Sequence, residues 1–306
     1  PTVDLGTGRT ATSISTGFQH TCAILDNASV KCWGRGWQGM LGTGSSNNLG
    51  DGLNEMGDNL PTVDLGTGRT ATSISAGREA HTCAILDDNS TKCWGRGYYG
   101  QTGQGNNDTI GDAADEMGDN LPVVNLGTGR TATAIAPGKY HTCALLDNAS
   151  VKCFGDNAYG QLGSGNTTDL GDGADEMGDN LTMVDLGTGR TATAITAGSD
   201  FTCVILDNAS VTCWGRNQYG QLGIGNTDNI GDGADEMGDN LTMVDLGTGR
   251  TATAINSGFA STCVYLDNSD TKCWGRNNQG QLGQGDALVK GDSAGQMGDN
   301  LPAIDL

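Results

Sequence analysis

The strongest constraint on the fold is an internal repeat. The stretch Cys203–Gly225 occurs five times with small changes, and its copies begin at Cys22, Cys83, Cys143, Cys203 and Cys263. Consecutive copies are therefore 60 or 61 residues apart along the whole chain. A fixed period of this size indicates a repeat architecture, in which each unit buries its apolar surface against its neighbours.

The period also sets the domain organisation. A length of 306 residues alone would suggest about two domains. The repeat instead predicts a single repeat domain, 1–306, with repeats at approximately 1–60, 61–121, 122–181, 182–241 and 242–301 and a closing segment at 302–306. Because the sequence starts at Pro1 rather than at a methionine, we expect a processed or trimmed product.

Each repeat contains about four strand-like segments and no helical periodicity. It opens with Val-Asp-Leu-Gly, as at Val63–Gly66, and continues with Gly-Arg-Thr-Ala-Thr-x-Ile, as at Gly8–Ile14, where alternation and β-branched residues indicate a strand. Two further strands flank a turn such as Asp26-Asn27. The sequence therefore predicts an all-β protein, a β-propeller of five four-stranded blades of about 60 residues each.

Ten cysteines occur as two per repeat, always ten positions apart. A turn centred on Asn27 places Ile24 opposite Val30 and Cys22 opposite Cys32, within reach of a disulfide. We predict one disulfide per blade, pairing Cys22 with Cys32, Cys83 with Cys93, Cys143 with Cys153, Cys203 with Cys213 and Cys263 with Cys273. Zinc or free thiols are the alternative, although zinc sites favour closer cysteine pairs. Paired cysteines in this number indicate an oxidising compartment.

The closing motif of the repeat resembles a known family. Cys213–Gly225 reads Cys-Trp-Gly-x-Asn-x-Tyr-Gly-Gln-Leu-Gly-x-Gly, Gly138–Leu145 reads Gly-x-x-His-Thr-Cys-Ala-Leu, and both are similar to the regulator-of-chromosome-condensation repeat. The resemblance covers the whole chain and implies a β-propeller. It implies no single function, because the family includes a nucleotide-exchange factor, ligase-linked modules, a plant photoreceptor and a secreted β-lactamase inhibitor. The cysteine pairs resemble those of the secreted members.

The chain differs from the family in the number of repeats, since well-known members have seven blades. The Val-Asp-Leu segment occurs a sixth time as Ile304-Asp305-Leu306, after the fifth repeat has ended. Either the two ends of the chain complete one blade and close a ring, or the array is open and associates head to tail. Both arrangements remain open at the level of the sequence.

An acidic insertion follows the Gly-Gln-Leu-Gly hairpin of each repeat and is a candidate Ca²⁺ site. Closely spaced carboxylates among glycines supply the oxygen ligands that Ca²⁺ prefers, although the spacing does not match an EF-hand. The alternative is a solvated loop whose acidic side chains bond to their own backbone. The candidate ligands are Asp112, Asp115, Glu116, Asp119, Asp172, Asp175, Glu176, Asp179, Asp232, Asp235, Glu236 and Asp239.

Several other recurrent residues have mainly structural explanations. We expect Trp33 and its counterparts to pack between blades, and Arg9 and its counterparts to pair with an Asp of Val-Asp-Leu or of Met-Gly-Asp-Asn-Leu. Asn-x-Ser/Thr sequons are candidate N-glycosylation sites in a secreted eukaryotic protein. They are Asn27, Asn89, Asn107, Asn148, Asn166, Asn180, Asn208 and Asn240.

Charge and symmetry narrow the function. The net charge of −20 disfavours nucleic acid as a partner, and no apolar run is long enough to span a membrane. Near-identical repeats argue against an enzyme, because catalysis needs one site that breaks the symmetry. We predict an extracellular or cell-surface scaffold that associates with itself or with other extracellular proteins. The alternative is a discrete protein- or glycan-binding propeller that uses variable loops on one face: Thr16–His20, Ala76–His81, Pro137–His141, Ala197–Phe201 and Ser257–Ser261.

Overall fold

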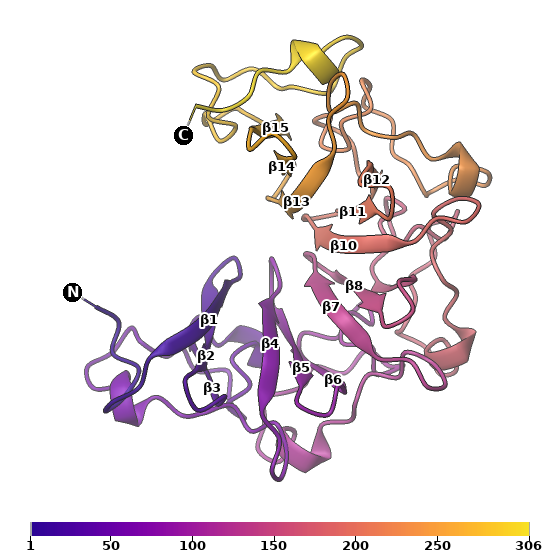
Figure 1. Ribbon diagram of the computed structural model, residues 1–306. Helices are drawn as coiled ribbons and strands as arrows, with labels where there is room; N and C mark the ends of the chain where they lie inside the picture. The colour runs from indigo at the N-terminus through magenta and orange to yellow at the C-terminus, as the bar shows by residue number, and fades with distance from the viewer. Residues whose placement is uncertain (1, 306) are drawn as a thin grey trace. The chain divides into compact units, whose positions relative to one another are not determined.

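A computed structural model describes residues 2–305 and contains five three-stranded antiparallel sheets, one from each repeat (Figure 1). The strands are β1 (Ala11–Thr16), β2 (His20–Leu25), β3 (Val30–Gly34), β4 (Ala71–Ala76), β5 (His81–Leu86), β6 (Thr91–Gly95), β7 (Ala132–Pro137), β8 (His141–Leu146), β9 (Val151–Gly155), β10 (Ala192–Ala197), β11 (Phe201–Leu206), β12 (Val211–Gly215), β13 (Ala252–Ser257), β14 (Ser261–Leu266) and β15 (Thr271–Gly275). Short 3₁₀ turns lie at η1 (Trp37–Gly39), η2 (Gly57–Asn59), η3 (Gly118–Asn120), η4 (Gly178–Asn180), η5 (Gly238–Asn240) and η6 (Gly298–Asn300). No helix of the described chain is long and apolar enough to cross a membrane.

The strands group into two compact units. The first comprises the chain up to Thr142 together with Leu170–Leu181, and the second comprises Cys143–Asp169 together with the chain from Thr182 onward. Each unit has its own apolar core, built around buried tryptophans. Trp94 lies in the core of the first unit and Trp274 in that of the second, and both side chains are fully buried.

The cysteine hairpin has the predicted register. In the first repeat Cys22 lies opposite Cys32 and Ile24 opposite Val30, and the turn places Ala28 at a left-handed φ of 61°. All ten cysteines are joined in the five predicted pairs, each with a Cα–Cα distance of 4.1 Å. The prediction of one disulfide per repeat is therefore confirmed.

The prediction of four strands per blade is not confirmed, since each sheet has three strands. The Val-Asp-Leu segment is bonded to the third strand of the preceding repeat without forming a strand of its own, and isolated bridges pair Thr62 with Lys31 and Met243 with Thr212. Val63 N donates to Val30 O at 2.8 Å, and equivalent bonds join Val124 to Thr91, Val184 to Val151 and Val244 to Val211. These isolated contacts do not extend into a ladder, so the fourth position holds an extended segment.

Buried lysines help to fix this segment. Lys92, which has only 6% of its surface exposed, donates from Nζ to the carbonyl oxygens of Leu65 at 3.0 Å and Gly118 at 2.7 Å. The first carbonyl belongs to the Val-Asp-Leu segment and the second to η3. A single ammonium thus joins the segment that opens the second repeat to the 3₁₀ turn near the end of the same repeat. It also gives the Leu65 carbonyl a buried donor.

The sixth copy of the segment follows the same rule. Ile304 N donates to Thr271 O at 2.8 Å, so the copy completes the fifth sheet; Leu306 lies outside the described residues. Within residues 2–305 no sheet lies against the first copy: the Val3 side chain is 57% exposed, whereas Val63 is 6% exposed. Each Val-Asp-Leu segment therefore belongs structurally to the repeat before it.

The expected partner of the recurrent arginine was wrong. Arg9 Nη1 lies 3.2 Å from the Asp26 carboxylate, at the hairpin turn of its own repeat, rather than near an Asp of a neighbouring blade. The same pairing joins Arg69 to Asp87 and Asp88, Arg190 to Asp207 and Arg250 to Asp267. These groups are about one-third exposed, so each pair contributes little to stability.

Candidate functional site

Two sets of loops come together at one end of four of the sheets. The loop after the first strand of a repeat is bonded to the loop after its third strand, because Arg35 N donates to Gln19 O at 2.9 Å. Equivalent bonds join Arg96 to Ala80, Arg216 to Asp200 and Arg276 to Ala260. The predicted variable loops therefore share a surface with a second set of loops.

In the first unit these loops form a cluster of cations and aromatic rings. The Arg96 guanidinium lies 4.8 Å from the ring centroid of Tyr140, 5.6 Å from those of Tyr98 and Tyr99, and 5.8 Å from that of Trp37. The rings come from three different repeats and surround one positive charge. We call Arg35, Trp37, Arg96, Tyr98, Tyr99, Lys139 and Tyr140 the Arg-aromatic cluster.

Two further cations belong to this cluster. Arg35 lies 4.9 Å from the Trp37 ring centroid, and Lys139 Nζ lies 4.7 Å from that of Tyr140. Cation–π contacts of this kind contribute about 0.5–1 kcal/mol at exposed sites. In the described chain neither Arg35 nor Arg96 pairs with a carboxylate, and the buried Nε of Arg96 has no acceptor. The cluster therefore keeps its positive charge in a protein with a net charge of −20.

The loops also expose apolar rings to solvent. Tyr98 is 60% exposed, and Phe18, on the β1–β2 loop, is 65% exposed. In the second unit Arg216 again lies over a ring, 4.6 Å from the Tyr159 centroid, but it is also 3.3 Å from the Asp200 carboxylate. The first unit thus differs in combining several rings with unneutralised cations.

The loops after the third strands were not predicted as part of this surface. Arg35, Arg96, Arg216 and Arg276 all follow the Trp-Gly pair, and only Asp156 breaks the series. Their recurrence was visible in the sequence. It carried no signal for a surface site, because the distance between two loops of one repeat depends on the sheet that joins them.

The acidic insertions are held by bonds to their own backbone. Glu116 Oε2 accepts from the amides of Gly111 at 2.8 Å, Asp112 at 3.1 Å and Ala113 at 3.0 Å. Asp119 accepts from the amide and hydroxyl of Thr67, and these bonds lower the pKa of its carboxyl. The pattern recurs with Glu176, Asp179, Glu236 and Asp239.

In each candidate Ca²⁺ loop, two of the four acidic side chains therefore already accept hydrogen bonds from the protein. Burial and the nearby Glu116 raise the pKa of Asp112, while Asp115 adopts a left-handed φ of 65°. Among residues 2–305 no three His, Cys, Asp or Glu side chains are grouped as in a metal site. The arrangement supports the turn-forming interpretation of the insertion, and Ca²⁺ binding stays a prediction.

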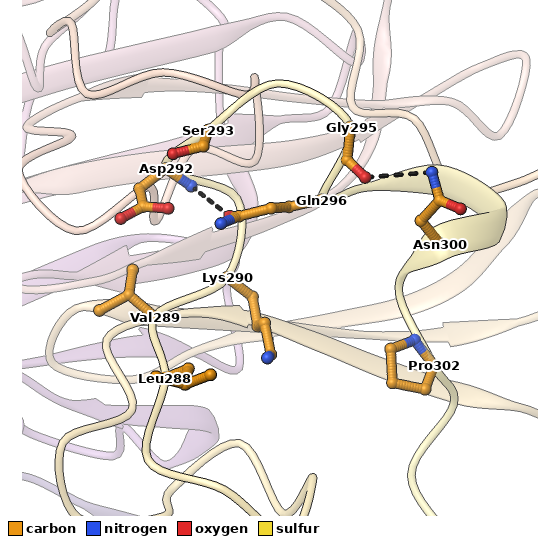
Figure 2. A pocket seen from close by; sticks show the side chains of 9 residues that line it. All are labelled: Leu288, Val289, Lys290, Asp292, Ser293, Gly295, Gln296, Asn300 and Pro302. Atoms are coloured by element: carbon orange, nitrogen blue, oxygen red, sulfur yellow. Dashed lines mark hydrogen bonds between the residues drawn. The ribbon is translucent and has the colours of Figure 1, made fainter.

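A pocket in the fifth repeat shows where the repeats diverge (Figure 2). Its volume is about 490 Å³, and a pocket of about 500 Å³ occupies the same place in the second repeat. Leu288, Lys290, Gly295 and Gln296 line the fifth-repeat pocket where Asp108, Ile110, Asp115 and Glu116 line the other. Lys290 pairs with Asp286 at 2.8 Å, so the positive charge of this pocket is neutralised.

The acidic insertion of the fifth repeat keeps the same backbone hydrogen bonds although Gln296 replaces the glutamate. Gln296 Oε1 accepts from the amides of Gly291 at 2.7 Å and Asp292 at 3.1 Å, as Glu116 does in the second repeat. An uncharged amide can therefore replace the carboxylate in this role.

All eight sequon asparagines are exposed, including those on the hairpin turns, and their glycosylation stays a prediction.

These features define a repeat protein of β-propeller blades with a loop-built surface. The regulator of chromosome condensation (RCC1) repeat matches residues 11–36, 71–101, 132–161 and 192–221. The chain belongs to the RCC1-repeat family.

Similar proteins include the human E3 ubiquitin-protein ligase HERC2, at 26% identity over 274 residues, and the Arabidopsis thaliana ultraviolet-B receptor UVR8, at 26% identity over 280 residues. These alignments cover 89% and 90% of this chain. The chain spans 5% of the first protein and 55% of the second, so it corresponds to only part of either.

Solved structures show the same fold at low identity. Human WBSCR16 matches with a TM-score of 0.70 at 16% identity, covering 97% of this chain and 68% of that protein. Yeast RCC1 (Prp20), in a crystal structure with Kap60, matches with a TM-score of 0.65 at 19% identity, covering 89% of this chain and 57% of that protein.

Proposed function

We propose that the chain is a non-catalytic protein-binding propeller module, and that the Arg-aromatic cluster binds an acidic segment of a partner protein. The observation that carries the proposal is the Arg96 guanidinium, which lies within 6 Å of four ring centroids and has no carboxylate partner. Tryptophan, tyrosine and arginine are the residues most enriched at binding hot spots.

Charge favours an acidic partner over a basic or neutral one. The cluster presents Arg35, Arg96 and Lys139 in a chain that is acidic elsewhere. A carboxylate can approach a guanidinium edge-on with two hydrogen bonds while the rings cover its faces. Such recognition should weaken as salt rises, because salt screens exposed charges.

A peptide selection tests this proposal. Phage-displayed random peptides selected on the full chain should be rich in Asp and Glu. Arg96→Ala should weaken a selected peptide about thirtyfold, as expected for a hot-spot residue worth about 2 kcal/mol. Arg96→Lys keeps the charge and tests the planar fork, and Tyr98→Ala removes an exposed ring. Arg276→Ala, which removes a cation–ring pair in the second unit, is the matched control.

Three outcomes would count against the proposed site: peptides without acids, peptides that bind Arg96→Ala as tightly as the original chain, or peptides equally sensitive to Arg276→Ala. Salt-independent binding of neutral glycans, lost in Tyr98→Ala, would favour a glycan instead of a protein segment.

We further propose an extracellular or cell-surface location for this activity. Support comes from the five disulfides, which persist in oxidising compartments, and from the exposed sequons. Intact-mass analysis of native material before and after reduction and deglycosylation measures both features. Ten free thiols in native material would contradict the proposal. A scaffold role through self-association is the second candidate, and the near-identity of the five repeats favours it.

A further inference from the structure

Two buried side-chain donors at the Arg-aromatic cluster lack an acceptor. Gln101 is fully buried, and its Nε2 makes no hydrogen bond within residues 2–305. The same is true of Arg96 Nε, although the guanidinium lies against the surrounding rings. A buried donor without an acceptor costs free energy, so two of them in one place indicate that something else supplies an oxygen there.

The other end of the amide fixes the orientation of Gln101. Its Oε1 accepts from the Tyr99 amide at 2.9 Å. Gln161 occupies the same position in the third repeat, and its Oε1 accepts from the Tyr159 amide at 2.9 Å. Because the two amides are held in the same way, the partner of Gln161 Nε2 shows what kind of group fits opposite Gln101 Nε2.

In the third repeat that partner is a carboxylate. Gln161 Nε2 donates to Asp156 Oδ2 at 2.7 Å, and the Ala158 amide donates to Asp156 Oδ1 at 3.3 Å. Asp156 occupies the position of Arg96. The second repeat therefore keeps the glutamine but has a further donor in place of the acceptor.

In the fifth repeat one oxygen accepts from both side chains. Asn278 Oδ1 accepts from Arg276 Nε at 2.9 Å and from Gln281 Nε2 at 3.4 Å. Asn278 occupies the position of Tyr98, which instead places its ring 5.6 Å from the Arg96 guanidinium carbon. The arginine and the glutamine of a repeat can thus share one acceptor oxygen, and the second repeat has no residue that provides it.

We propose that an Asp or Glu carboxylate of the bound partner supplies this oxygen and accepts hydrogen bonds from Arg96 Nε and Gln101 Nε2. The inference rests on the proposed function and deepens it, because it names the two atoms that the acidic segment reaches. A carboxylate is favoured over other anions, since Asp156 places one opposite the equivalent glutamine. Gln101, a neutral residue outside the cation–ring contacts, thereby becomes a residue that determines specificity.

Nuclear magnetic resonance of the side-chain N–H groups tests this contact on the full chain. Acetate carries the carboxylate of an aspartate side chain, and its addition should shift the signals of Arg96 Nε–H and Gln101 Nε2–H along a saturating curve. The two signals are assigned by their loss in Arg96→Lys and Gln101→Glu. Acetamide, which has the same shape without the charge, should leave both signals in place.

Gln101→Glu separates binding from a structural role. Glutamate keeps the oxygen that accepts from the Tyr99 amide, but it replaces the donor with a carboxylate that repels the one on the partner. Affinity for acidic peptides selected on the unaltered chain should fall at least roughly tenfold, because a hydrogen bond to a charged group is lost. Gln221→Glu makes the same change in the fourth repeat, where Arg216 already pairs with Asp200, and this matched control should bind normally.

A substitution at an exposed residue gives a second test that does not disturb the core. Tyr98→Asn introduces the side-chain oxygen that Asn278 provides in the fifth repeat, whereas Tyr98→Leu only removes the phenol ring. Both variants lose the ring contact with Arg96. Tyr98→Asn should therefore bind the selected acidic peptides more weakly than Tyr98→Leu, because its own oxygen competes for the two donors.

The outcomes distinguish this inference from the proposed function. Acetate that causes no saturable shift, or a Gln101→Glu variant that binds the acidic peptides as tightly as the unaltered chain, would overturn the inference. The proposed function would stand in either case if Arg96→Ala still weakened those peptides. Selected peptides without acids, together with saturable acetate shifts, would refute the proposed function alone. Inorganic phosphate that shifts both signals at lower concentration than acetate would overturn the assignment of a carboxylate.

Discussion

Mild acid should destabilise the fold through three buried histidines. His20, His81 and His141 have at most 3% of their surface exposed. Burial lowers the pKa of His20 to about 4. Burial also lowers the pKa of His81 to about 3, with smaller effects of His141 and His20, and burial and then Arg78 lower that of His141 to about 3.

The geometry explains why the neutral form is favoured. His81 Nε2 lies 3.0 Å from Thr142 Oγ1, while its Nδ1 is buried with no partner in the described chain. Protonation would place a second N–H, with a charge, where nothing accepts it. His20 has the same arrangement, with Nε2 2.9 Å from Thr82 Oγ1.

The lowered pKa values determine whether stability rises or falls with pH. Between the folded values and the unfolded value of about 6.5, the unfolded chain binds more protons, so stability falls as the pH falls. The histidine contribution is complete above about pH 6.5 and decreases below it. At about pH 5 each histidine should cost about 2 kcal/mol relative to pH 8, and all three together about 6 kcal/mol.

The fourth repeat supplies a matched variant. Phe201 takes the place of the histidine there and is fully buried, so His81→Phe should fit. Urea unfolding followed by tryptophan fluorescence at pH 8 and pH 5 gives the pH dependence of each protein. His81→Phe should lose about 2 kcal/mol less than the unaltered chain over this interval. An identical pH dependence would refute the reasoning, because it would mean that His81 does not stay neutral in the fold.

Three other predictions concern stability and ligands. Replacing Cys203 and Cys213 by serine removes a disulfide that spans 10 residues and should cost about 2.8 kcal/mol in chemical unfolding, so an unchanged midpoint would contradict the pairing. Val63→Ala should cost about 1.5–2 kcal/mol and Val3→Ala almost nothing, since the first side chain is buried and the second exposed; equal effects in thermal unfolding would argue against the placement of the Val-Asp-Leu segment. If the acidic insertions bind Ca²⁺, added Ca²⁺ should raise the melting temperature and a chelator should reverse the rise, whereas an unchanged value would reject that prediction.

The hairpin could be predicted because its geometry is local. A turn at Asn27 and the alternation of a strand fix which residues face each other, and Cys22 does lie opposite Cys32. The fourth strand could not be distinguished from an extended segment, because the difference is the number of backbone bonds rather than residue type. Val63 makes one such bond to the neighbouring sheet.

The Asp partner of the recurrent arginine could not be predicted from the sequence either. Every repeat offers several acids at the same period, so spacing alone does not choose between Asp26 and the Asp of Val-Asp-Leu for Arg9. Only part of the Arg-aromatic cluster could be predicted from the sequence. Lys139 and Tyr140 lie on one of the variable loops that we predicted to form a binding face. Arg96 and Tyr98 lie within the repeated motif, outside those loops. The packing of neighbouring repeats places them beside Tyr140, which the sequence alone does not predict.

The sequence repeat starts with the Val-Asp-Leu segment, but this segment completes the sheet of the repeat before it. This difference determines where the chain can be truncated without damaging a sheet. A truncation at residue 60, the end of the first sequence repeat, would strip Val63 from the sheet it completes and leave Val30 O without its bond. A truncation a few residues later, after Leu65, would keep that sheet whole. Gene duplications that add or remove one unit would meet the same requirement, so a breakpoint just after the Val-Asp-Leu segment should yield shorter or longer arrays that still fold.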